Sequence, residues 1–459
     1  MAGFLVVVLV VVLVVVLGLG AIPDSIFTEG NIVMRSLKGR SPAGFALALA
    51  VGFGFGCGAR AEGIATPPEP KPLWMKVTAH DKFDRTKVVS TGVSIEVTAD
   101  DYVMVIGDET QAQALNKMGL LISKFPATQE LLDFPTQDSN FHNYARLKAD
   151  LEALAASHPK IVVLDSIGKS VEGRELLRLT ISIDPKKATS LPAALIMGGH
   201  HAREHVSVEV PLMFAQRLLS LFDKGDTEAV RLISSRDIEI VPLVNPDGAE
   251  YDIENGSYKV WRKNRTLNVD GSSGVDLNRN YSKGWDNVEG ASSDPGNETF
   301  RGLSPFSEPE TQAVKAWVDS RANATTLLTL HTYSQLVLYP WGGAYDAVAD
   351  TRDASVFTTM AKQMAAWNGY TPMQASNLYL ASGDTCDWAY SAHKIFAFTF
   401  EMDPSSFLRD GFYPGQAKLP EIFEKNFKPM MYIIDVADNP YKVIEPKQAA
   451  WGMSTSLIQ

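Results

Sequence analysis

Residues 193–206 read AALIMGGHHAREHV, a short apolar run that leads through two glycines into a polar cluster. The apolar run 193–197 has the length of a buried strand, and the segment from 206 to 222 has apolar residues at helical spacing. In folds that alternate strands and helices, reactive groups lie just beyond the carboxyl ends of strands. The polar cluster between the two apolar segments is therefore expected to lie at a functional site.

The same alternation of short apolar runs and helical patterns continues through most of the chain. Helical patterns occupy residues 144–157, 206–222, 308–322, 354–367 and 419–437. Strand-like runs occupy residues 161–164, 176–183, 193–197, 238–244, 327–330 and 396–400. The order predicts an α/β fold whose mixed sheet is covered by helices on both faces, and no internal repeat interrupts it.

A smaller unit precedes this region. Residues 87–97, 102–106 and 120–123 have strand character and residues 109–117 have helical character, which predicts a small α+β domain over 73–125. Residues 64–72 contain four prolines and are expected to form an extended linker. Residues 126–138 are polar and form a second linker, which we expect to be sensitive to proteases.

The first 63 residues have the features of a signal or anchor region. Residues 4–19 are almost entirely Val and Leu, but no Lys or Arg precedes them. A second segment starts at Met34 and has the signal-peptide order of basic residues, an apolar run over 43–55 and small residues at 59–61. Either translation starts at Met34, or the first stretch is a membrane anchor. Cleavage is favoured over lipidation of Cys57, and in each case the chain is expected to be exported.

Charge and cysteine content exclude two classes of protein. The chain carries 42 Lys and Arg against 53 Asp and Glu, a net charge of -11, and no basic stripe is present, so nucleic acid is not an expected partner. The two cysteines are Cys57 and Cys386, and the first lies in the exported leader region. A structural disulfide is therefore not expected, and packing must stabilise the fold.

The polar cluster contains a candidate metal site. His201 and Glu204 are three residues apart and can face one ion from a single turn at the helix entry. His331 follows the apolar run 327–330 and supplies a third ligand at another strand end. Two nitrogens and one carboxylate leave a position for water, as in catalytic zinc sites.

The spacing of His201 and Glu204 is common by itself and usually marks only a solvated helix turn. His201 and His205 are spaced like the two ligands of an H-E-x-x-H helix, but position 202 is Ala, so that motif is absent. His200 and His205 are expected to pack or to form local hydrogen bonds.

Six separate strings, in order along the chain, resemble the zinc metallocarboxypeptidases, the group that includes pancreatic carboxypeptidases A and B and bacterial carboxypeptidase T. The strings are GHHARE at 199–204, NPDG at 245–248, WRK at 261–263, GVDLNRN at 274–280, HTYSQ at 331–335 and FTFE at 398–401. The resemblance implies a carboxypeptidase-like catalytic domain over 139–440, with an eight-stranded type of mixed sheet, followed by a tail over 441–459.

The resemblance implies one zinc ion per catalytic domain, held by His201, Glu204 and His331. It places Glu401 as the general base and acid that promotes attack of zinc-bound water on the last peptide bond. Independently, a carboxylate at the end of the apolar run 396–400 is partly desolvated, which suits that role. Arg262 matches the arginine that polarises the scissile carbonyl and stabilises the oxyanion.

The same resemblance assigns substrate contacts. Asn278 and Arg279 look like the pair that grips the terminal carboxylate of the substrate, a task that suits the guanidinium fork. Tyr379 is similar to the mobile tyrosine that closes over the bound C-terminal residue. Arg203 resembles a residue that contacts the substrate further along.

The preferred C-terminal residue of the substrate is harder to predict from the resemblance. The position that selects this residue in the family is occupied here by Cys386, which is small and only mildly apolar. Asp384 is expected to reach a Lys or Arg side chain at the pocket base, as in the broad-specificity bacterial members. Leu338, Gly342 and Thr399 would leave room for an apolar or aromatic side chain. We therefore expect broad tolerance for apolar and basic C-terminal residues.

The sequence thus predicts a secreted or periplasmic zinc carboxypeptidase, a monomer that acts on peptides or proteins with a free C-terminus. By analogy with the family, the unit at 73–125 is expected to be a prodomain that shields the cleft. A permanent accessory domain is the alternative.

Three rival functions are a binding protein without turnover, a cell-wall peptidase, and a deacylase or esterase. Retention of every ligand and of Glu401 disfavours the first, and Asn278 with Arg279 disfavours the third.

Overall fold

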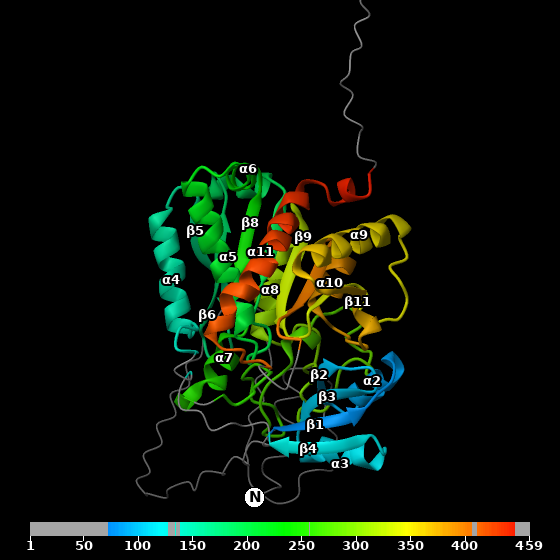
Figure 1. Ribbon diagram of the computed structural model, residues 1–459. Coiled ribbons are helices and arrows are strands. Elements are labelled where there is room, and N and C mark those ends of the chain that lie inside the picture. The colour runs from blue at the N-terminus through cyan, green and yellow to red at the C-terminus, as the bar shows by residue number, and fades with distance from the viewer. Residues whose placement is uncertain (1–71, 127–133, 135–137, 257, 406–410, 446–459) are drawn as a thin grey trace, which may run out of the picture. The chain divides into compact units, whose positions relative to one another are not determined.

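The computed structural model describes residues 72–126, 134, 138–256, 258–405 and 411–445 (Figure 1). The two apolar stretches near the N-terminus, Cys57 and the tail beyond 445 lie outside these residues. None of the helices that the structure describes is both long enough and apolar enough to cross a bilayer.

The first described unit is a four-stranded antiparallel sheet with two helices. Its sheet has the order β2-β3-β1-β4. The elements are β1 Leu73–Thr78, α2 Lys82–Val89, β2 Ser94–Thr98, β3 Tyr102–Gly107, α3 Glu109–Lys117 and β4 Leu121–Pro126. Met75, Val77, Val103 and Val105 on the strands and Val88 on α2 form one buried cluster. The expected α+β unit is therefore present in the structure.

One expectation within this unit was wrong. Residues 87–93 were expected to belong to a strand, but residues 87–89 end helix α2. The side chain of Asp81 accepts hydrogen bonds from the backbone N–H of Phe83 and of Asp84, which caps the helix start. Val88 and Val89, the residues that gave the strand-like pattern, are buried because this helix packs against the sheet.

The larger sheet has eight strands in the order β11-β10-β12-β9-β7-β8-β6-β5. The strands are β5 Val162–Lys169, β6 Glu175–Ile181, β7 Ala193–Met197, β8 Asp237–Val241, β9 Ala324–Thr332, β10 Leu336–Tyr339, β11 Thr371–Gln374 and β12 Phe396–Met402. Strands β8, β7, β9 and β12 are parallel, whereas β6 pairs antiparallel with β5 and β8, and β10 pairs antiparallel with β12. This arrangement confirms the expected mixed sheet.

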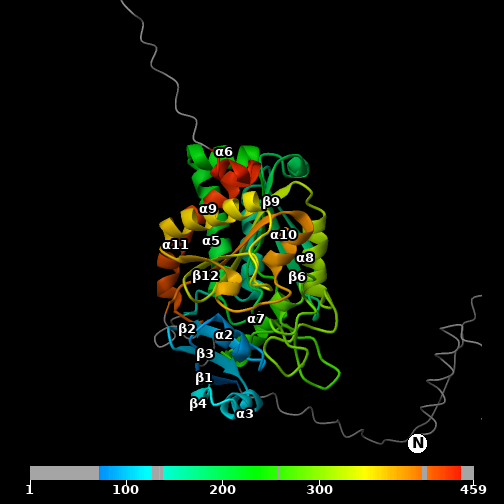
Figure 2. The ribbon, with the colours of Figure 1, turned by 90° about the vertical axis from the view of Figure 1, so that its right-hand side faces the viewer.

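Helices cover both faces of this sheet (Figures 1 and 2). The helices are α4 Tyr144–Ser157, α5 Val206–Asp223, α6 Thr227–Ser235, α7 Pro246–Asp252, α8 Pro309–Asp319, α9 Thr351–Asn368, α10 Thr385–His393 and α11 Leu419–Asp435. Alternate side chains of β7 point to opposite faces of the sheet. Ala194 and Ile196 belong to the cluster that includes α4, α5, α9 and α11, whereas Leu195 and Met197 belong to the cluster that includes α8 and α10.

Two strands extend further than expected, so two candidate site residues lie within strands and not at their ends. His331 and Glu401 were expected at strand ends, but β9 continues to Thr332 and β12 to Met402. The two residues are direct neighbours in the parallel register of β9 and β12. Strand β12 extends because β10 pairs with it, Leu336 lying opposite Glu401. That pairing is between segments distant in sequence, and local pattern does not reveal it.

The strand that leads to the polar cluster ends at a close backbone approach. A Cβ atom added at Gly198 would lie 1.9 Å from the carbonyl oxygen of Ser207, in the first turn of α5. Gly198 also donates to the carbonyl oxygen of Val241 and accepts from the backbone N–H of Val244. Only glycine fits where these three backbone segments meet.

We therefore predict that Gly198→Ala displaces the loop that carries His201 and Glu204. The free energy of unfolding should fall by roughly 1–3 kcal/mol, the usual cost of overpacking. Urea denaturation followed by tryptophan fluorescence measures this change. Gly296→Ala is the matched control, because its added Cβ would meet no atom closer than 3.4 Å. Equal stability of the two variants would contradict the prediction.

Candidate metal centre and substrate cleft

The segment 198–205 is a turn between β7 and α5 that backbone hydrogen bonds hold in place. Gly199 adopts φ of 63°, and its carbonyl oxygen accepts from the backbone N–H of Asn245. The side-chain amide of Asn245 donates to the carbonyl oxygen of His200 at 3.1 Å. Because α5 begins only at Val206, His201 and Glu204 lie in this turn and not in the first turn of the helix.

The three expected ligands come together. Nδ1 of His201 lies 2.7 Å from Oε1 of Glu204, and Nδ1 of His331 lies 3.0 Å from Oε2 of Glu204. The two Nδ1 atoms are 3.2 Å apart. All three side chains are buried, and their ligand atoms lie within 4.8 Å of one another.

This donor set fits zinc. Burial, followed by the positive charge of Arg262, lowers the pKa of His201 below its ordinary value, and the same two causes lower the pKa of His331 to about 3. Both imidazoles are therefore neutral in the structure, the form that binds a metal. Two imidazole nitrogens that face each other beside a carboxylate match the nitrogen and oxygen ligands of a catalytic zinc site.

The second nitrogen of each imidazole also has a partner. Nε2 of His201 lies 3.2 Å from Oδ1 of Asp276, and Nε2 of His331 lies 3.2 Å from Oγ1 of Thr329. Partners of this kind fix the tautomer and the orientation of ligating histidines. Asp276 lies in the string GVDLNRN at 274–280, but no role was predicted for it from the sequence.

Asp276 links the ligands to Arg262. Its Oδ2 accepts from Nε of Arg262 at 3.0 Å and from Nη2 at 2.9 Å. Burial alone would raise the pKa of Asp276, but Arg262 and His201 hold it well below the ordinary value. The carboxylate is therefore charged, and Arg262 is fixed at the edge of the cleft.

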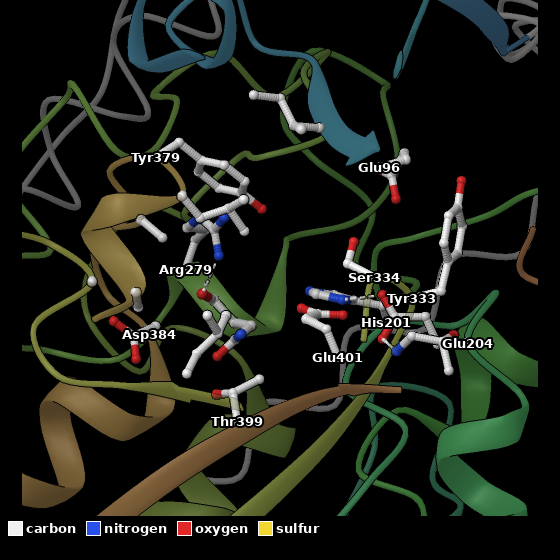
Figure 3. A pocket seen from close by; sticks show the side chains of 18 of the residues that line it. Glu96, His201, Glu204, Arg279, Tyr333, Ser334, Tyr379, Asp384, Thr399 and Glu401 are labelled. Carbon is white, nitrogen blue, oxygen red and sulfur yellow. Dashed lines mark hydrogen bonds and ion pairs between the residues drawn. The ribbon is translucent and has the colours of Figure 1, made fainter. Parts of the chain in front are cut away.

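A cleft with an empty volume of about 700 Å³, part of which is open solvent, extends from the ligands (Figure 3). Glu401 lines it beside His201 and Glu204. Burial, followed by the carboxylates of Glu204 and Glu96, raises the pKa of Glu401 well above its ordinary value. The other lining residues are Ile95, Glu96, Arg262, Asn278, Arg279, Thr332, Tyr333, Ser334, Leu338, Gly342, Ala375, Leu378, Tyr379, Ala381, Asp384 and Thr399.

Asn278 and Arg279 lie together in this cleft. The side-chain oxygen of Asn278 accepts from the backbone N–H of Thr385 at 3.0 Å and from its hydroxyl at 2.9 Å. Its amide NH₂ group therefore remains a donor for the cleft. Arg279 is nearly buried and is held by bonds from Nε to the carbonyl oxygen of Gly290 and from Nη1 to that of Asn278.

Asp384 caps helix α10 and also faces the cleft. Its Oδ1 accepts from the backbone N–H groups of Cys386 and Asp387 at 2.9 and 3.0 Å. Its Oδ2 is buried and has no hydrogen-bond partner among the residues that the structure describes. Burial raises the pKa of Asp384 above its ordinary value.

Two expected substrate contacts do not line the cleft. Cys386 lies behind Thr399, with 3.3 Å between Sγ and Oγ1, and Thr399 forms the wall instead. Arg203 is completely buried and bonded to Glu96 of the N-terminal unit, with 2.6 Å between Nη2 and Oε1. Glu96, Ile95 and Tyr333 were not identified from the sequence. No local signal marks the first two as cleft residues, because only the docking of β2 brings them there.

Comparison with known proteins agrees with this geometry. A family model described as zinc carboxypeptidase matches residues 147–429. A zinc carboxypeptidase of Saccharothrix mutabilis subsp. capreolus is 32% identical over 404 residues, which covers 83% of this chain and 92% of the relative. Carboxypeptidase A1 of Rattus norvegicus is 29% identical over 357 residues, or 76% of this chain and 80% of the relative.

The fold agrees as well. The solved structure of carboxypeptidase A from Helicoverpa armigera superposes with a TM-score of 0.66 at 23% identity, over 81% of this chain and 98% of that chain. The family resemblance expected from the six strings is thus confirmed. The chain belongs to the zinc carboxypeptidase family and is a metallocarboxypeptidase, a hydrolase whose cofactor is zinc.

Proposed function

We propose that this carboxypeptidase removes single apolar or basic residues from the free C-termini of peptides and proteins, with Glu401 promoting the attack of water. The observation that carries the proposal is the convergence of Glu401, His201, Glu204 and the Asn278–Arg279 pair on one cleft, with His331 grouped with the other two ligand residues. As a second part of the proposal, the chain is exported and the unit at 73–125 keeps it inactive until processing.

His201, Glu204 and His331 would hold one zinc ion. When bound, zinc acts as a Lewis acid that polarises the substrate carbonyl and lowers the pKa of water. Asp276 and Thr329 orient the two imidazoles for this purpose.

Glu401 would move the protons. It lies beside the ligands in register with His331, so it can accept a proton from the attacking water and deliver it to the leaving amine. Arg262 would donate to the oxyanion that forms on the scissile carbonyl. Since Asp276 already fixes its guanidinium, little reorganisation is needed when that charge develops.

Asn278 and Arg279 would bind the terminal carboxylate of the substrate, and Tyr379 would close over its last residue. Both donors are positioned by backbone and side-chain contacts before substrate arrives. A buried guanidinium with an adjacent amide suits a carboxylate and not an internal peptide bond. This pair supports exopeptidase activity and weighs against an esterase.

The walls of the cleft support broad specificity. Leu338, Gly342 and Thr399 leave room for an apolar side chain, and the unpartnered Oδ2 of Asp384 can accept from a Lys or Arg side chain. Cys386, behind Thr399, would act only through that wall.

The N-terminal unit supports a zymogen. Glu96 and Ile95 on β2 line the cleft itself. Arg85 on α2 donates to the carbonyl oxygens of Asn377 and Leu378, immediately before Tyr379. The hydroxyl of Thr86 accepts from the backbone N–H of Leu380 at 3.3 Å. The unit thus contacts the residues on both sides of Tyr379 in the sequence, and cleavage within 126–138 would remove the tether and allow the unit to dissociate.

We predict that Glu401→Gln lowers kcat for a blocked dipeptide by at least about 100-fold, because it removes the proton acceptor. Glu424→Gln on α11, which is exposed, is the matched control and should retain full activity. The activated wild type should lose activity with a chelator and regain it with zinc. It should also leave the C-terminally amidated dipeptide intact. Equal cleavage of the free and amidated substrates would rule out the role of Asn278 and Arg279.

We predict that Asp384→Asn lowers the ratio of kcat/KM for Lys-ended over norleucine-ended peptides by about tenfold, the size of one buried charge interaction. Asn also caps helices, so α10 should persist. Initial rates on the two matched peptides measure the ratio. An unchanged ratio would exclude Asp384 as the acceptor for basic residues.

We predict that Glu96→Gln raises the activity of the unprocessed chain about tenfold, because it removes a charge-assisted bond to Arg203. Glu109→Gln is the control, since Glu109 pairs with Lys124 at the exposed side of the same unit. Hydrolysis of a blocked dipeptide by intact chains, checked by electrophoresis, gives the result. An equal rise in both variants would indicate general loosening and not loss of a specific contact.

A further inference from the structure

We propose that His200 is a positioning residue that links the zinc ligand His331 to Asn278, through a chain of buried hydrogen bonds that fixes the orientation of the Asn278 amide. The inference deepens the proposed function and rests on it, since Asn278 is there a donor to the terminal carboxylate of the substrate. His200 does not line the cleft, so it would act only through its neighbours.

His200 joins parts of the chain that are distant in sequence. Its imidazole is completely buried in the turn after β7 and stacks on the ring of His331, with 5.6 Å between the centroids. Nδ1 of His200 lies 3.4 Å from Oγ1 of Thr329, which itself lies 3.2 Å from Nε2 of His331. Nε2 of His200 lies 2.9 Å from the hydroxyl of Tyr281 and 3.3 Å from Oγ1 of Thr385. One imidazole therefore bridges a metal ligand and the start of α10.

The direction of these hydrogen bonds follows from the ligand atom of His331. That atom is Nδ1, which faces Glu204, so the ring proton of the neutral imidazole is on Nε2. Nε2–H donates to Thr329, and the hydroxyl proton of Thr329 is left for Nδ1 of His200. A buried imidazole whose hydrogen-bond partners are hydroxyls is neutral, so His200 carries its proton on Nε2. It donates from there to the two hydroxyl oxygens on that side.

The last link of the chain orients Asn278. Since Oγ1 of Thr385 accepts from His200, its own proton is left for Oδ1 of Asn278, to which it donates at 2.9 Å. The backbone N–H of Thr385 donates to the same oxygen at 3.0 Å. With two donors on Oδ1, the NH₂ group of Asn278 is left to donate to a carboxylate in the cleft. All of the relaying side chains are buried, so water cannot replace a lost link.

A metal at His331 and a carboxylate at Asn278 would thus favour the same arrangement of protons. Without the metal, the ring proton of His331 can occupy Nδ1 and donate to Glu204, whose Oε2 is 3.0 Å away. Thr329 then has no donor from His331, and the hydroxyls along the chain are free to turn. Binding of zinc and binding of the terminal carboxylate should therefore strengthen each other, and this coupling is reciprocal.

The first measurement separates KM from kcat. The full chain, cut within 126–138 and loaded with zinc, is assayed on a blocked dipeptide with a free carboxylate. Thr385→Val removes the hydroxyl and keeps the backbone N–H, and it should raise KM about tenfold, the value of one buried hydrogen bond. The change in kcat should be much smaller, because Asn278 holds the substrate both before and during the reaction. Thr385→Ser restores the hydroxyl and should restore the wild-type KM.

The second measurement does not depend on catalysis. Isothermal titration calorimetry gives the Kd of 3-phenylpropionate, a probe with one carboxylate and one apolar ring, for chelator-treated and zinc-loaded protein. Zinc should strengthen binding to the wild type about fivefold more than binding to His200→Leu, the lower end of the usual coupling between two sites. Direct attraction between the probe and the metal is present in both proteins and cancels.

His205→Gln is the control for disturbance of the turn. His205 is buried in the same turn, but its Nε2 lies 2.9 Å from Asp252. Zinc should therefore strengthen probe binding to His205→Gln as much as to the wild type.

Equal effects of zinc on the wild type and His200→Leu, or a KM that Thr385→Val leaves unchanged, would overturn the inference and leave the proposed function intact. If His200→Leu does not fold, Thr385→Val replaces it in the calorimetric comparison. A wild type that neither cleaves the dipeptide nor binds the probe would instead count against the proposed function.

Discussion

The buried carboxylate of Asp276 joins three parts of the site that are distant in sequence. Its Oδ1 contacts Nε2 of His201 and accepts from the backbone N–H of Asn278 at 3.0 Å. Its Oδ2 binds the guanidinium of Arg262. A ligand of the metal, the proposed donor for the oxyanion and the start of the Asn278–Arg279 turn are therefore held by one side chain with no exposed surface. A charge in such a place is stable only when every bond to it is made, so these three parts must assemble together.

The sheet gives that assembly its framework. Parallel strands β7, β9 and β12 end at the same edge, which brings the turn at 198–205 next to His331 and Glu401. The adjacent register of His331 and Glu401 sets the distance between a ligand and the proposed proton carrier by strand geometry alone. Side chains on regular strands are held more exactly than side chains on long loops, and this suits a reaction that depends on alignment.

Local pattern predicted the parts of the fold that are determined locally. The bounds of α4 and β7 agree with the periodicity, and the grouping of His201, Glu204 and His331 agrees with their positions after apolar runs. The short strands β10 and β11 and helix α10 were not predicted, because they are stabilised by pairing of β10 with β12, by pairing of β11 with β10 and by packing on the sheet. The strand assigned to residues 87–97 was wrong over 87–93 for the same reason, since Val88 and Val89 are apolar for tertiary packing. Glu96 could not be found from the sequence, because a carboxylate on a strand acquires its role only where that strand docks.

The covalent linker strengthens the competition of Glu96 for Arg203. Segments held in one chain meet at effective concentrations in the millimolar range or above, so a dilute peptide competes poorly with an attached carboxylate of similar intrinsic affinity. Cutting the linker would convert Glu96 from an intramolecular ligand into a dilute one without altering a single contact at Arg203. Access to the cleft would then depend on whether the linker is intact and not on the affinity of Glu96 for Arg203. Because a cut peptide bond does not re-form, a single cut would open the cleft irreversibly.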